Sequence, residues 1–199
     1  SQLHQHNTHV MRWGAPVEQW PGISIGCDNF SGGQSVTRHL LSHDYRSFAF
    51  IGDIGDKAPE FQSRYEGFLS ALDKHHTHHQ YDAISSEEAG IEAANHLLET
   101  TSALPDAIVC AADIIAVGVL QQLKEAGIRV PEDVAVVGFD NIQLAAFTTP
   151  GLTTVQQNTA KAGEKLVENL LLAIDGHPTD DHLLPTNLVV RQSCGCDIK

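Results

Sequence analysis

A carboxylate that follows an apolar run is the residue of this sequence best suited to bind a ligand. Residues 134–139 form a short β-branched run, too continuous for a half-exposed strand, and Asp140 follows it directly. Such runs suit parallel sheets covered on both faces, and open α/β folds bind ligands at the carboxyl edge of these sheets. Asp140 could there accept hydrogen bonds from two neighbouring hydroxyl groups. The alternative is that Asp140 caps a short helix beginning at Ile142.

Two groups of residues could bind a metal ion. Cys194 and Cys196 are two positions apart near the C-terminus, and a histidine cluster consists of His75, His76, His78 and His79. Thiolates and imidazoles at such spacings can share an ion. Partners for the cysteine pair are not evident nearby in the sequence, and we expect the histidines in a variable loop between a helix and a strand. We therefore predict no metal site and no cofactor.

The composition excludes several other classes of protein. The 199 residues hold 12 Lys and Arg against 25 Asp and Glu, a formal charge of -13, which argues against DNA binding by this chain itself. We find no run long enough to cross a bilayer, no Gly-rich phosphate loop and no nucleophile motif, so we predict no membrane contact and no enzyme activity. Cys27 and Cys110 lie in apolar stretches as small buried residues, which favours a reducing, cytoplasmic setting.

Strand-like and helix-like segments alternate at short intervals, which predicts an α/β fold with mainly parallel sheets. Residues predicted as helices show apolar positions at helical spacing, with Ser85 and Glu88 as a capping box and Asp113 and Asn158 as caps. The predicted strands are 10–13, 23–27, 48–52, 81–84, 107–111, 134–139, 152–155 and one inside 183–191, and the predicted helices are 30–43, 60–72, 85–98, 113–126 and 158–175.

The run VPEDVAVVGFDN at 130–141, followed by PGLTTVQQ at 150–157, resembles the effector-binding core of the lac repressor (LacI/GalR) family of transcription regulators. That family is related to periplasmic sugar-binding proteins, and the resemblance runs from about residue 10 to 193. It implies a two-lobed periplasmic-binding-protein-like fold. The N-terminal lobe would comprise 1–43 plus 157–178, and the C-terminal lobe 44–156 plus 179–199. We expect the helix-turn-helix headpiece to be absent and the N-terminal lobe to be incomplete.

The resemblance also implies effector contacts. Arg64, with Gly67 and Phe68, matches the family pattern R-x-x-G-F, and its guanidinium is a planar fork of donors suited to hydroxyls or anions. The alternative is an ion pair of Arg64 with a glutamate on its own helix. Gln157 and Asp28 match further family positions.

Asp113 also matches a family position, although it could instead cap its own helix. Relatives often place Asn before this acid, where the present sequence has Ala112. The effector contact of that Asn is therefore lost, and effector specificity cannot be copied from a relative.

The resemblance therefore predicts a ligand-sensing domain that binds a small sugar-like effector between its lobes. DNA binding would need the missing headpiece, and a homodimer is expected from the family. The first alternative is a periplasmic sugar-binding protein of a transport system, and the second is an enzyme on a related α/β scaffold.

Overall fold

A computed structural model of the chain describes residues 9–15, 22–55 and 58–196. Two compact units make up the chain. The small unit comprises Ser1–Asp28 and Asn158–Thr186, and the large unit comprises Asn29–Gln157 and Asn187–Lys199. These boundaries differ from the predicted lobe boundaries, because the helix after Asp28 packs within the large unit.

The large unit is built on a six-stranded sheet in the order β4-β3-β5-β6-β7-β9. All neighbouring strands are parallel except β7 and β9, which confirms the α/β class with mainly parallel sheets. β5 is buried along its whole length, and β6 along all but its last residue, Asp140. The strands are β3 (Ser47–Ile51), β4 (Thr77–Tyr81), β5 (Ala107–Cys110), β6 (Ala135–Asp140), β7 (Thr153–Gln156) and β9 (Asn187–Val189).

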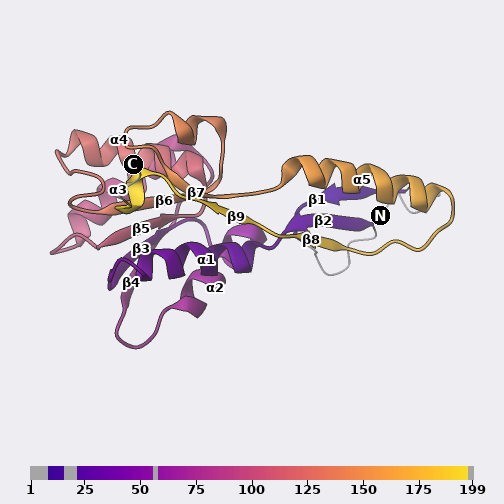
Figure 1. The fold of residues 1–199 in the computed structure, drawn as a ribbon. Helices are drawn as coiled ribbons and strands as arrows, with labels where there is room; N and C mark the ends of the chain where they lie inside the picture. Colours follow the sequence, from indigo (N-terminus) through magenta and orange to yellow (C-terminus); the bar gives the residue numbers. More distant parts are fainter. Residues whose placement is uncertain (1–8, 16–21, 56–57, 197–199) are drawn as a thin grey trace. The chain divides into compact units, whose positions relative to one another are not determined.

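Two pairs of helices cover this sheet, α1 with α2 on one face and α3 with α4 on the other (Figure 1). The α1–α2 crossing is close enough that a Cβ on Gly33 would lie 2.1 Å from the carbonyl oxygen of Arg64. Glycine is therefore required at this crossing, which fixes Arg64 next to the start of α1. The helices are α1 (Asn29–Leu41), α2 (Pro59–Ala71), α3 (Glu87–Thr100) and α4 (Asp113–Glu125), with short 3-10 helices η2 (Gln143–Ala146) and η3 (Gln192–Cys194).

The small unit contains a parallel three-stranded sheet in the order β1-β2-β8, with β1 at Met11–Trp13, β2 at Ile23–Cys27 and β8 at His182–Leu184. Helix α5 (Thr159–Ile174) packs on β1 and β2 and buries Ala162 and Asn169. As predicted, the side chain of Asn158 caps α5, accepting from the backbone N–H of Lys161. Part of the predicted apolar stripe, including Ile174, is exposed instead of packed.

Three local predictions were wrong. The strand expected at 81–84 is Thr77–Tyr81 and includes His78 and His79, because an edge strand with one neighbour tolerates exposed polar residues. Ser86, not Ser85, caps α3 by accepting from the backbone N–H of Ala89. The last strand is two strands in two sheets, β8 and β9. Pro185 lies between them and cannot donate to a ladder.

Candidate functional site

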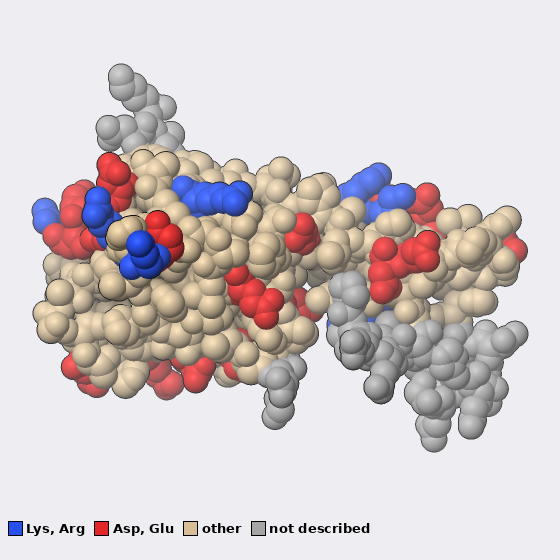
Figure 2. Space-filling model, turned by 90° about the horizontal axis from the view of Figure 1, so that it is seen from below, with Lys and Arg blue, Asp and Glu red and all other residues tan. Residues whose placement is uncertain are grey.

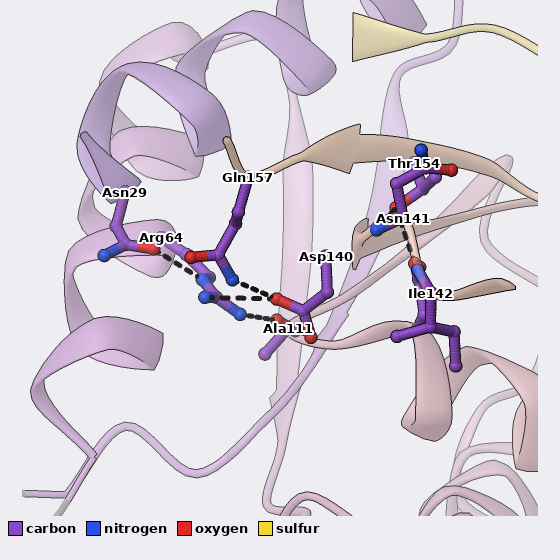
Figure 3. Close-up of polar contacts among 9 residues, drawn as sticks. Asn29, Arg64, Ala111, Asp140, Asn141, Ile142, Thr154 and Gln157 are labelled. Atoms are coloured by element: carbon purple, nitrogen blue, oxygen red, sulfur yellow. Dashed lines mark hydrogen bonds and ion pairs between the residues drawn. The ribbon is translucent and has the colours of Figure 1, made fainter. Parts of the chain in front are cut away.

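Polar side chains from several elements of the large unit meet at the carboxyl edge of its sheet (Figure 3). Asp140 is the last residue of β6, and Gln157 follows the end of the neighbouring strand β7. Arg64 reaches them from α2, and Asn29 is the first residue of α1. The carboxyl edge of a parallel sheet is where α/β folds bind ligands, so we take this cluster as the candidate site.

Arg64 is the central cation of the site, although its side chain is only 5% exposed. Its Nε donates to the Asn29 side-chain oxygen at 2.8 Å, and Nη1 donates to the Ala111 carbonyl at 2.5 Å. Its Nη2 lies 3.4 Å from Oδ1 of Asp140. The guanidinium carbon lies 3.8 Å from the ring centroid of Phe139, a cation–π distance. Arg64 is buried, so the predicted alternative of a solvated helix arginine does not hold.

Asp140 lies beside this cation and is partly open, with its side chain 29% exposed. Its Oδ1 accepts a hydrogen bond from Gln157 Nε2 and forms the ion pair with Arg64. Within the described part of the chain, Oδ2 has no contact of this kind. Burial raises the pKa of Asp140, while Arg64 and the Gln157 hydrogen bond oppose that rise. The cation thus favours the ionised, hydrogen-bond-accepting carboxylate.

The backbone of this turn adopts an uncommon conformation. Asp140 has φ of 116° and Asn141 has φ of 54°, both in the region that disfavours side chains. Such a conformation persists only where surrounding contacts enforce it, and it is frequent at ligand sites. The contacts here come from Asp113 and Arg191, two residues that flank the turn.

Asp113 supports the turn through two hydrogen bonds. It is fully buried, and its carboxylate accepts from the backbone N–H of Ile142 at 2.8 Å and from the Thr154 hydroxyl at 2.5 Å. Asp113 is the first residue of α4, and the helix has no side-chain cap, so the predicted capping role of Asp113 was wrong. The alternative role considered for Asp140, capping the helix at Ile142, is also wrong, because the Ile142 N–H donates to Asp113.

Burial dominates the ionisation of Asp113. It raises the pKa of this carboxyl to about 6, although hydrogen bonds from Thr154 and Ile142 act in the opposite direction. The negative charge of Asp140 raises it further, and Arg191 lowers it. The two acids at neighbouring strand ends are therefore electrostatically coupled.

Arg191 was not predicted as a site residue. Its Nη2 donates to the Asn141 side-chain oxygen at 2.8 Å, and its Nη1 donates to the Leu152 carbonyl at 2.6 Å. It follows the last strand, so it reaches the turn only through the antiparallel pairing of β9 with β7. No local sequence pattern indicates that contact.

The other predicted residues differ in position. Gln157 lies in the cluster, whereas Asp28 belongs to the small unit, where its backbone N–H donates to the Leu184 carbonyl at 2.8 Å. Among the cavities in the described ranges, one of about 460 Å³ lies at the amino ends of β3 and β4, beside Ser47 and Thr77. This cavity is at the opposite edge of the sheet from Asp140 and is not part of the candidate site.

The surface gives no support for nucleic-acid binding by this chain. On the face shown in Figure 2, Lys and Arg form small separate groups among Asp and Glu, as the charge of -13 implies. No helix in the described ranges is both long and apolar enough to span a membrane.

Comparison with known proteins shows the family to which the chain belongs. Residues 37–194 match the periplasmic binding protein-like domain, and the chain belongs to that family. The chain is 33% identical over 172 residues to the HTH-type transcriptional repressor PurR of Glaesserella parasuis serovar 5, covering 84% of this chain and 49% of the relative. It therefore spans about half the length of the curated relatives it matches.

Solved structures agree with this assignment. A LacI family transcriptional regulator from Enterococcus faecium, solved with bound ribose, matches with a TM-score of 0.86 and 25% identity over 96% of this chain and 72% of that chain. An uncharacterized protein from Actinobacillus succinogenes matches with a TM-score of 0.85 and 31% identity, over 96% and 73% of the two chains. The chain is thus an effector-binding core of the LacI/GalR type, as the sequence resemblance predicted.

Proposed function

We propose that this chain is the ligand-sensing part of a LacI-type transcription regulator and binds a small hydroxyl-rich effector, a sugar or sugar derivative. The observation that carries the proposal is the Arg64–Asp140 pair at the carboxyl edge of the sheet. A partly exposed carboxylate paired with a buried guanidinium is an oriented hydrogen-bond acceptor. Sugars present pairs of neighbouring hydroxyl groups to such acceptors, and the ribose bound to the related Enterococcus regulator supports this choice.

Each residue of the cluster would have a distinct role. Asp140 would accept from the effector through Oδ2, since its Oδ1 is already engaged by Gln157 and Arg64. Arg64 would orient Asp140 and keep it ionised, and Gln157 would offer its amide to the effector. Because Asp113 is buried, we propose that it acts on the effector through the turn at Asn141 and Ile142 rather than by contact. Asp28 remains a predicted effector contact.

The remaining parts of the proposal concern the whole protein. A DNA-binding headpiece outside this chain would bind the operator, since the charge of -13 disfavours DNA binding by the chain itself. Effector binding would favour one of two conformations and so change operator affinity. We further propose a homodimer, a cytoplasmic location and no catalytic activity. The PurR relative and the Enterococcus structure are transcription regulators, which favours this function over sugar transport.

Effector binding can be tested by thermal shift and calorimetry with a panel of ribose, other pentoses and hexoses, sugar phosphates and nucleosides. A binder at 100 times its Kd should stabilise the protein by about 2.7 kcal/mol. Asp140→Asn replaces a charged acceptor with a neutral one. Hydrogen bonds to charged groups contribute about 1.5–3 kcal/mol, so binding should weaken by about tenfold or more.

Asp133→Asn is the matched control. Asp133 also pairs with an arginine, Arg129, but on the exposed surface away from the site. Effector affinity should be unchanged in this variant. If Asp140→Asn and Arg64→Lys bind the effector as tightly as the control does, the assigned site is wrong.

A further inference from the structure

Two histidines and two cysteines from distant parts of the sequence meet on the large unit. His39 lies in the last turn of α1, and His43 follows one turn later. Cys194 ends η3, and Cys196 is two residues beyond it. One potential ligand atom from each of these four residues lies within 4.8 Å of every other. The cysteine pair that had no evident partners in the sequence therefore has two in the fold.

The distances within this His39–His43–Cys194–Cys196 cluster suit tetrahedral coordination. His39 Nε2 lies 3.3 Å from Cys194 Sγ and 3.5 Å from Cys196 Sγ, and His43 Nε2 lies 3.2 Å from Cys196 Sγ. Zinc binds sulfur at about 2.3 Å and nitrogen at about 2.0–2.1 Å, so ligand atoms at tetrahedral angles lie about 3.3–3.8 Å apart. Small movements of these side chains would place one ion at the centre of the cluster.

The surrounding backbone already presents the four side chains in this arrangement. Gly195, between the cysteines, has φ of 89°, and a Cβ there would lie 2.6 Å from the Tyr45 hydroxyl oxygen. Glycine is therefore required for the tight turn that brings both thiols to one side. The Tyr45 hydroxyl donates to the Cys194 carbonyl at 3.2 Å, and the Tyr45 ring stacks on His43 with centroids 5.6 Å apart. Tyr45 thus contacts His43, which follows α1, and Cys194, which lies in the C-terminal segment.

We propose that His39, His43, Cys194 and Cys196 bind one Zn²⁺ ion in a closed, structural site. Two thiolates and two imidazoles are a ligand set that zinc favours over the harder Mg²⁺ and Ca²⁺. Four protein ligands leave no position for a substrate, which excludes a catalytic role. The ion would join the C-terminal segment after β9 to the end of α1. This inference is independent of the effector and departs from the sequence prediction of no metal site.

The test is zinc analysis of the untagged chain, purified under reducing conditions and dialysed against metal-free buffer. Plasma mass spectrometry should find about one zinc per chain, as expected for a single four-ligand site. After removal of zinc, added Co²⁺ should give the visible bands of a tetrahedral ion and a near-ultraviolet thiolate charge-transfer band. Chelation should lower the Tm of the wild-type chain.

Three variants test whether the zinc is bound by this cluster or by other histidines and cysteines of the chain. Cys196→Ser and His43→Gln each remove one proposed ligand at a half-buried position and should lose most of the zinc and the cobalt bands. His79→Gln is the control, because it removes an exposed histidine of β4 and should keep both. Far-UV circular dichroism on all three shows whether they are folded.

Several results would overturn the proposal. One is a folded wild-type chain that binds neither zinc nor cobalt. Another is zinc that Cys196→Ser retains or that His79→Gln loses, since the metal would then be held adventitiously by other histidines. A Cys194–Cys196 disulfide that persists in reductant, with no bound metal, would also exclude the site.

Discussion

The buried carboxyl of Asp113 makes the stability of the large unit depend on pH. Its pKa in the folded chain is about 6, against an ordinary value of 3.8, with burial as the main cause. A folded-state pKa above the unfolded value means that the folded chain binds the proton more tightly. This group therefore stabilises the fold most below pH 3.8, and its contribution is lost as the pH rises through about 6. The variant that removes this effect is Asp113→Asn.

The magnitude follows from the difference between the two pKa values. They lie about two pH units apart, and each unit corresponds to about 1.4 kcal/mol, so ionising Asp113 costs the fold about 3 kcal/mol in all. Roughly half of this cost, about 1.4 kcal/mol, falls between pH 5 and pH 8. An asparagine oxygen can still accept from the Ile142 N–H, and its amide can donate to the Thr154 hydroxyl. Asp113→Asn therefore retains partners for both contacts, with the Thr154 bond reversed, and removes the titration.

Urea unfolding of both proteins at pH 5, 6, 7 and 8 measures this difference. Far-UV circular dichroism is the suitable signal, because both tryptophans, Trp13 and Trp20, precede the large unit in the sequence. The unfolding free energy of wild type minus that of Asp113→Asn should rise by about 1.4 kcal/mol from pH 8 to pH 5. Asp140 titrates in both proteins, so its effect on the difference in unfolding free energy largely cancels. A constant difference across this range would refute a raised pKa at Asp113.

Three further substitutions test the packing and the helix caps. Gly138→Ala should destabilise the large unit by about 1–3 kcal/mol, because the new Cβ would lie 2.2 Å from Oδ1 of Asp113; urea unfolding by circular dichroism measures this. Gly163→Ala, the contrasting case, has open space around its Cβ on exposed α5 and should stabilise the small unit by about 0.5–1 kcal/mol in tryptophan-detected unfolding. Asn158→Ala should cost the same unit about 1 kcal/mol, since the Lys161 N–H loses its acceptor; an unchanged midpoint would show that the cap is dispensable.

The sequence predicted the elements that depend on local pattern. Apolar, β-branched runs predicted β3, β5 and β6, and helical spacing predicted α1 to α5 to within a few residues. From these elements followed the parallel sheet and the placement of Asp140 at its carboxyl edge. Burial on both faces leaves a strand little choice of residue types, so such strands are visible in a single sequence.

Polar edge elements were harder to predict, because water satisfies their side chains in any conformation. β4 has the sequence THHQY, and only Tyr81 is buried. Its strand conformation comes from pairing with β3 and not from its own composition. The histidine cluster was therefore expected in a loop.

Contacts between distant residues could not be derived from spacing at all. Arg191 meets Asn141 across 50 positions, and Cys196 meets His43 across 153. Each contact depends on where β9 returns to the sheet, which is a property of the whole topology. The His-x-x-x-His spacing of His39 and His43 was the one local signal for the second contact, since residues four apart in a helix share a face.

Two acids at neighbouring strand ends show why a motif predicts a class of site but not a role. Asp113 follows β5 and Asp140 ends β6, and both fit the rule that polar residues at the carboxyl edge bind ligands. Gly138 leaves space next to the turn for the Asp113 carboxylate. That carboxylate is fully buried and accepts hydrogen bonds from Ile142 and Thr154. Asp140 belongs to the turn itself, and its side chain is 29% exposed and paired with Arg64. Burial, which depends on packing from elsewhere in the chain, therefore separates a supporting acid from an acid available to an effector.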